Sequence, residues 1–184
     1  MNQYLEQIKP NVSDTWRADE LYVKINGNMK YLFAMMDDET RFWIAQEVAE
    51  TKDKHDAKKL FTRAKYLMGK QPKIFTTDGL VTYSAASAEV FPNAQHIRKI
   101  SLDGKFHNNN KMERMNGEIR DREKTMRGLK TKDTPILQGY QIFHNYIRPH
   151  EGLDGKTPSE ACGIIIEGTN KWKTLIQNAS KKEG

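Results

Sequence analysis

The sequence of 184 residues is poor in cysteine, and Cys162 is the single one. One thiol cannot form a disulfide within the chain, which is typical of a protein from a reducing compartment. No group of cysteines and histidines has the spacing of a structural zinc site. The chain also lacks the roughly 18 consecutive apolar residues of a membrane span. Because no apolar run follows a basic end within Met1–Pro10, we expect no signal peptide and a cytoplasmic protein.

Charged residues, in contrast to cysteine and long apolar runs, are abundant in the chain. Charged residues make up 29% of the chain and hydrophobic residues 37%, a balance that fits one soluble domain with a sizeable core. The net charge is +6, with a sequence pI near 9.3. This excess of positive charge favours an anionic partner such as nucleic acid.

Alternating apolar and polar residues predict strands in the first part of the chain, after a loop-like entry over residues 1–14. A first strand over Trp16–Ile25 and a second over Met29–Met36 flank the hairpin turn Asn26–Asn28, and a third covers Arg41–Val48. One face of the first strand carries Arg17, Asp19, Leu21, Val23 and Ile25.

Helical spacing then alternates with short strands. The pattern predicts a helix over 53–68 closed by Gly69, a strand over Pro72–Thr77, a helix over 80–90 and a strand over Gln95–Ile100. It then predicts a helix over 108–124 and another from Pro135 to Arg148. A capping box over Thr157–Glu160 and an amphipathic segment from Trp172 follow. Such an order predicts an α/β protein with a mixed five-stranded sheet covered by helices, which is the arrangement of the RNase H-like fold.

Three carboxylates lie at positions that favour a catalytic or metal-binding role. Asp19 lies on an apolar strand face, where an ionised group is costly unless it is paired or bound to metal. Asp78 ends a strand, where open α/β sheets tend to place their sites. Glu113 lies on a helix between an apolar and a basic face. Each has a plain structural alternative: an exposed edge strand, a turn with Gly79, and a surface ion pair.

A basic stripe runs along the same helix. Arg120, Lys124 and Arg127 fall within roughly 40° of Glu113 around the helix axis. Together with Arg114 and Lys130, these cations are candidates for sequence-independent, salt-sensitive contacts with DNA phosphates. The alternative is a solvated helix face.

Other acids and histidines fit a site less well. Glu118 lies about 140° around the helix from Glu113, so the two cannot face one metal pair. A turn role suits Asp37 and Asp38 better. We expect His107, with the Asn108–Asn110 run, at the rim of the site, and His144 on a helix surface or in the core.

The chain resembles the DDE transposases, the group with a retroviral-integrase-like catalytic core found in insertion sequences. The resemblance spans roughly residues 14–163 and is carried by Trp16–Glu20, Thr76–Gly79, Asn109–Arg114, Met126–Lys130, Asn145–His150 and Lys156–Ala161. The separation of Asp78 from Glu113 by 34 residues (113 − 78 − 1) is also of the length that this family shows.

The resemblance implies a catalytic triad of Asp19, Asp78 and Glu113 that holds two Mg²⁺ ions, with Mn²⁺ as a substitute. It implies cleavage of DNA at transposon ends and attack of the freed 3′-hydroxyl on target DNA, by a homodimer or larger assembly on the prokaryotic nucleoid. The implied division is an extension over 1–13, a catalytic core over 14–163 and a basic segment over 164–184.

Such transposases commonly carry an N-terminal DNA-recognition domain, and residues 1–13 are too few for one. This departure leaves two further hypotheses beside the transposase core. One is a non-catalytic DNA-binding or dimerising remnant, and the other is an RNase H-like nuclease acting on RNA–DNA hybrids.

Overall fold

The computed structural model describes residues 1–98, 110–132 and 135–182. Within them, five strands form one mixed sheet in the order β3-β2-β1-β4-β5. β1 (Thr15–Ile25), β2 (Asn28–Asp37) and β3 (Trp43–Ala49) form an antiparallel meander. β4 (Ile74–Thr77) runs parallel to β1, and β5 (Gln95–Arg98) runs parallel to β4. The predicted RNase H-like sheet is confirmed.

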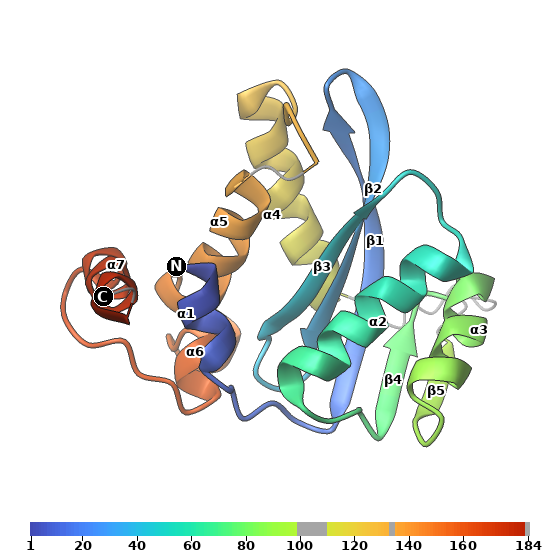
Figure 1. Ribbon diagram of the computed structural model, residues 1–184, viewed down its shortest axis with the longest axis horizontal. Helices are drawn as coiled ribbons and strands as arrows, with labels where there is room; N and C mark the ends of the chain where they lie inside the picture. The colour runs from blue at the N-terminus through green and yellow to red at the C-terminus, as the bar shows by residue number, and fades with distance from the viewer. Residues whose placement is uncertain (99–109, 133–134, 183–184) are drawn as a thin grey trace.

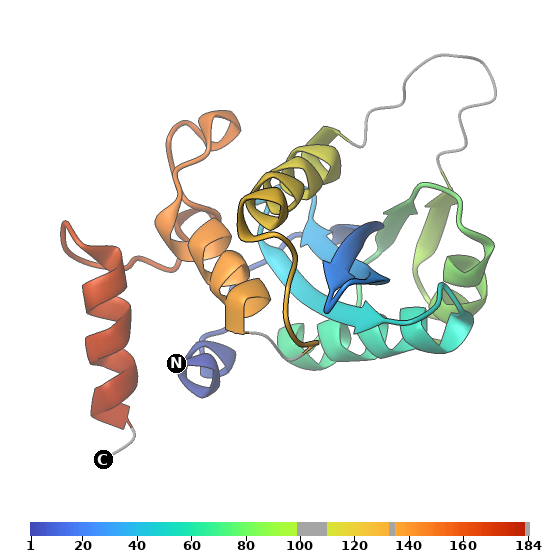
Figure 2. The same cartoon turned by 90° about the horizontal axis from the view of Figure 1, so that it is seen from above.

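Helices cover both faces of this sheet, as Figures 1 and 2 show. α2 (Lys54–Met68) and α3 (Val81–Val90) lie on one side, and α4 (Asn110–Met126) lies on the other. The remaining segments are α1 (Asn2–Gln7), α5 (Pro135–Ile142), a π-helical turn η1 (Phe143–Ile147), a 3-10 turn η2 (Glu151–Leu153), α6 (Pro158–Ala161) and α7 (Lys171–Lys182). No helix in the described ranges is both long and apolar enough to cross a membrane.

The alternation of β1 divides the core into two parts, as predicted. Trp16 and Ala18 are fully buried on the side of α2 and α3. Leu21 and Val23 are buried on the opposite side, in the cluster that α4 completes with Met112 and other residues. Asp19 belongs to this second face by its register, so its carboxylate faces the α4 side of the sheet.

Local signals fix several element ends where they were expected. The Asp53 carboxylate accepts a hydrogen bond from the Asp56 amide and starts α2. Gly69 ends that helix with φ of 66°, a conformation that glycine adopts without steric cost. Thr157 and Glu160 form the predicted capping box at the start of α6.

Three predictions of local structure were incomplete. The loop-like entry contains α1, a helix too short to be stable alone, whose Tyr4 and Leu5 pack against the core. The helix from Pro135 to Arg148 changes to a π-turn after Ile142. The apolar face predicted for the helix of Glu113 is buried at Met112, Met115 and Ile119, but Met126 is 39% exposed because it lies at the helix end.

Two sequence predictions fall partly outside the described residues. They are the end of the strand over Gln95–Ile100 and the rim of His107, Asn108 and Asn109. The helix predicted over 108–124 is described from Asn110 onward.

Candidate active site

Asp19 is placed on β1 at the point where the pairing with β4 stops. The last paired residues are Arg17 on β1 and Thr76 on β4, so Asp19 stands just beyond the ladder. Its strand neighbours on the same face, Leu21 and Val23, are buried in the core. The Asp19 carboxylate therefore lies between the apolar core and the part of β1 that does not pair with β4.

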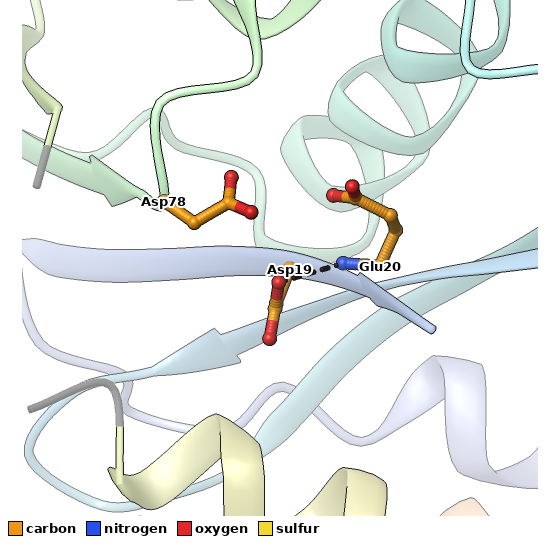
Figure 3. A group of neighbouring side chains, drawn as sticks. All are labelled: Asp19, Glu20 and Asp78. Atoms are coloured by element: carbon orange, nitrogen blue, oxygen red, sulfur yellow. Dashed lines mark hydrogen bonds between the residues drawn. The ribbon is translucent and has the colours of Figure 1, made fainter. Parts of the chain in front are cut away.

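Asp78 reaches the same region from β4, which ends one residue earlier at Thr77. One Asp78 carboxylate oxygen accepts a 3.3 Å hydrogen bond from the Leu80 amide at the start of α3. Because β1 and β4 are parallel neighbours, the acids after their paired segments meet. One oxygen from each of Asp19, Glu20 and Asp78 lies within 4.8 Å of the others, and Figure 3 shows the group.

Glu20 points to the opposite side of β1 from Asp19, and both of its carboxylate oxygens are engaged. Oε1 lies 2.7 Å from the Lys52 ammonium, and Oε2 accepts a 2.8 Å hydrogen bond from the Tyr83 hydroxyl. Its side chain is only 5% exposed. The charge of Glu20 is therefore compensated directly by the Lys52 ammonium.

Burial and mutual repulsion disfavour ionisation at this site. Burial is the main cause that raises the pKa of Asp19 to about 7, and the charges of Asp78 and Glu20 add to it. Burial also raises the pKa of Asp78, with the Glu20 charge as the next cause. Two carboxylates held together against their repulsion form a site where a cation would be stabilising.

Asn116, on α4, fixes the orientation of Asp19. Its side-chain amide donates a 2.9 Å hydrogen bond to Asp19 Oδ2, while Asp19 Oδ1 accepts a 3.0 Å bond from the Glu20 amide. Asn116 is 4% exposed, and its Oδ1 is buried without a hydrogen-bond partner. Sequence reasoning missed this residue, although its position three residues after Glu113 was an available signal.

Glu113 stands one helical turn before Asn116, in the first turn of α4. Its side chain is exposed, and it does not belong to the described acidic group of Asp19, Glu20 and Asp78. The same turn of α4 is anchored to the residue that follows β2, because the Lys111 ammonium lies 2.6 Å from the Asp38 carbonyl and 3.0 Å from its carboxylate. The structure thus brings two of the three predicted acids together and places the third on the adjoining helix.

A family model described as a DDE domain, of the IS240 transposase type, matches residues 13–150. The chain belongs to this DDE-domain family. No curated protein matches the chain significantly.

Solved structures share the fold of this DDE domain at low sequence identity. The catalytic core domain of HTLV-2 integrase in complex with magnesium, in its trimeric form, has a TM-score of 0.59 and 16% identity over 84% of this chain and 98% of the other. Its dimeric form has a TM-score of 0.56 and 14% identity over 82% and 94%.

A chain from the structure of a simian T-cell lymphotropic virus intasome in complex with the PP2A regulatory subunit B56 gamma has a TM-score of 0.64 at 14% identity. The match covers 82% of this chain but 55% of that chain, so this DDE domain spans about half of the longer protein.

The donor chemistry of the acidic group suits a hard divalent cation. Magnesium prefers a few carboxylate oxygens and keeps waters or substrate phosphates as its other ligands. Asp19, on β1, and Asp78, directly after β4, offer such oxygens. Asn116, which orients Asp19, is buried, and its Oδ1 has no hydrogen-bond partner. No other group of three or more acids, histidines or cysteines close enough for a metal occurs in the described ranges.

The cations predicted to contact DNA all lie on the surface of the DDE domain. They are Arg114, Arg120, Lys124, Arg127 and Lys130, and each is exposed. Lys124 lies 3.8 Å from Asp121, but both side chains are 80% exposed, so this pairing is weak. Arg127 ends α4 with φ of 56°, next to Gly128.

Other predicted and visible features lie apart from the acids. Asp37 has the expected turn role, since its carboxylate accepts hydrogen bonds from Ser13 and Thr40. His144 is a core residue whose pKa burial lowers to about 3. A cavity of about 470 Å³ lies near β3, α1 and α5, and β2 and β1 separate β3 from β4 in the sheet. Its lining includes none of the acids of the group.

Proposed function

We propose that this DDE domain is the catalytic core of a transposase that cleaves DNA at transposon ends and joins the freed 3′-hydroxyl to target DNA. The observation that carries the proposal is the meeting of Asp19 and Asp78 beyond the paired ends of neighbouring parallel strands. Membership of the DDE-domain family supports the same reaction class.

Asp19 and Asp78 would hold Mg²⁺, for which Mn²⁺ is the expected substitute. The fold neighbour solved with magnesium, the HTLV-2 integrase core, supports this choice. Two such ions would activate the attacking oxygen and stabilise the leaving oxygen of an in-line displacement at phosphorus. The chain then needs no side-chain nucleophile, and buried Cys162 supplies none, because burial raises the pKa of its thiol to about 11.

Glu113 is proposed as the third acid of the site. It occupies the first turn of α4, and Asn116 on the next turn already contacts Asp19. Its exposed side chain stands on the helix that faces the Asp19 side of the sheet. Glu20 is a weaker candidate because Lys52 and Tyr83 occupy both of its oxygens.

The DNA would lie along α4. The exposed cations from Arg114 to Lys130 follow one helix and its end, and they would neutralise phosphates without reading sequence. We further propose that the catalytic unit spans residues 14–163, acts on the prokaryotic nucleoid, and assembles with at least one more copy on DNA. The dimeric and trimeric forms of the integrase cores support the last point.

Nicking of DNA tests the proposal. Duplexes taken from the DNA on either side of the gene are incubated with the protein in Mg²⁺, in Mn²⁺ and in EDTA. We expect nicks in either metal but none in EDTA, and a loss of at least roughly 1,000-fold for Asp19→Asn, Asp78→Asn and Glu113→Gln.

Asp121→Asn is the matched control, because it removes an 80% exposed carboxylate from the same helix as Glu113. It should nick at the wild-type rate. Nicking that survives in the Asp19 and Asp78 variants would refute the site, and loss in those two but not in Glu113→Gln would remove Glu113 from it.

A further inference from the structure

The β1–β2 hairpin extends beyond the acidic group and carries an exposed aromatic surface. β4 pairs only with the first residues of β1, Thr15 to Arg17. Beyond them, the described residues pair with that edge of β1 only at its end, where Leu129 bridges Ile25. Figure 1 shows the hairpin projecting past α2 and α3. One face of this projection is buried under α4, and the other carries Tyr22 opposite Tyr31.

Tyr22 and Tyr31 form a pair on this face, with ring centroids 4.8 Å apart. Tyr22 is 47% exposed, which is unusual for a large ring that serves only packing. Their hydroxyls lie 3.4 Å from one another, so the two rings support each other across the strands. The pair therefore offers a supported aromatic surface to solvent.

Lys52 links this pair to the acidic group. Its ammonium lies 5.1 Å from the Tyr22 ring centroid and 5.0 Å from that of Tyr31. The same ammonium is 2.7 Å from Glu20, the strand neighbour of Asp19. Tyr22 follows Glu20 by two residues, about 7 Å along a strand, so the aromatic surface begins next to the proposed reaction centre.

The chemistry of this surface fits an unpaired nucleotide. Tyrosine rings stack on bases of any sequence, and Lys52 neutralises Glu20, which removes one negative charge that would repel a nearby phosphate. We propose that Tyr22, Tyr31 and Lys52, named here the tyrosine platform, bind an unpaired base of the DNA end next to the bond that is cleaved. This inference rests on the proposed function, since it places DNA at Asp19 and Asp78.

Binding without catalysis tests the platform. Fluorescence anisotropy in EDTA compares a DNA duplex that has a short single-stranded overhang with the same duplex made blunt. We expect Tyr22→Ala to weaken overhang binding roughly tenfold and to leave blunt binding within about twofold, whereas Tyr22→Trp keeps the wild-type affinity. A fluorescent base analogue in the overhang should be quenched by wild type and by Tyr22→Trp, but not by Tyr22→Ala.

Tyr66→Ala is the matched control, because it removes an 80% exposed tyrosine from α2. It should leave overhang binding and quenching unchanged. Equal overhang binding by wild type and Tyr22→Ala overturns the platform, even if wild type cleaves DNA in Mg²⁺. Loss of overhang binding in Tyr22→Ala supports the platform even where wild type fails to cleave, an outcome that would count against the proposed function alone.

Discussion

Asp19 shows how one residue can be destabilising and still define the site. Its position on a strand face with Leu21 and Val23 was readable from alternation, and the structure confirms that face. Its partners were not readable, because Asn116 lies 97 residues away and only packing of α4 on β1 brings the two together. The engagement of Glu20 by Lys52 and Tyr83 depends on tertiary contacts in the same way.

Removing the Asp19 charge should stabilise the metal-free protein. Its pKa in the fold, about 7, exceeds the ordinary value of 3.8, so the folded state holds a proton that the unfolded state releases. The free energy of unfolding therefore falls as pH rises from about 4 to 7, and it stays at the lower value above pH 7. At pH 8, we expect Asp19→Asn to be more stable by on the order of 1–3 kcal/mol, allowing for solvent screening.

Urea unfolding in EDTA at pH 5 and pH 8 measures this difference. Asp121→Asn, an exposed charge change, should alter neither value. A wild-type protein whose pH dependence matches that of Asp19→Asn would show that the Asp19 pKa is not raised.

Asn116 should set the response to magnesium. Without its 2.9 Å hydrogen bond, Asp19 can rotate away from the position that it shares with Asp78. We expect Asn116→Ala to raise the Mg²⁺ concentration for half-maximal nicking by roughly 10- to 100-fold, the usual effect of losing a group that orients a metal ligand. Thr125→Ala, an exposed change on the same helix, should leave that concentration unchanged. An unchanged Mg²⁺ dependence in Asn116→Ala would remove this residue from the site.

At the scale of elements, the helical segment after residue 135 holds the edge strand β3 in place. Asn145, in the π-turn, pairs with the Trp43 backbone as a second strand would: its Oδ1 accepts from the Trp43 amide at 2.8 Å, and its Nδ2 donates to the Trp43 carbonyl at 2.9 Å. Gln141 also donates to that carbonyl, at 2.9 Å. Helical periodicity could not show a π-turn, because an i→i+5 turn changes which residues face inward.

Asn145→Ala should therefore be strongly destabilising. The residue is 2% exposed, and its loss leaves the Trp43 amide buried without a partner. We expect the free energy of unfolding to fall by about 2–4 kcal/mol, measured by urea unfolding at pH 7. Gln177→Ala, an exposed position on α7, serves as control and should change it by less than about 0.5 kcal/mol. A loss for Asn145→Ala as small as that of the control would contradict the assigned role.

At the scale of the whole molecule, the order of strands and helices was predictable because the strands of the meander and the helix α2 have clear periods, and turn residues separate the shorter elements. What could not be predicted arises from packing between distant segments. α1 forms within a predicted loop because Tyr4 and Leu5 meet the core. The meeting of Asp19 with Asp78 was implied by the resemblance to DDE transposases, whereas the position of Glu113 outside the described acidic group was not expected.

The net charge of +6 and the exposed cations of α4 predict salt-dependent binding of DNA. Replacing Arg120, Lys124 and Arg127 by alanine should weaken binding of any duplex sequence alike. It should also reduce the slope of log affinity against log salt by about 2 to 3, since each phosphate contact contributes about 0.9. Anisotropy titrations between 50 and 200 mM salt would measure both effects.

The control replaces three α2 lysines that are paired with acids, Lys54 and Lys58 with Glu89 and Lys59 with Asp56. It changes the net charge by the same amount and should leave the salt slope nearly unchanged. Equal effects from the two triple variants would mean that net charge, and not the α4 surface, governs binding.

Joining of DNA is the most direct measure of whether Asp19 and Asp78 form a transposase centre. A pre-cut transposon end is mixed with plasmid DNA in Mg²⁺, and the labelled joined product is followed in a single turnover. We expect joining by wild type from an end with a 3′-hydroxyl, none from an end with a 3′-deoxy terminus, and none by Asp19→Asn or Asp78→Asn. Joined product from either variant at the wild-type rate would contradict this expectation.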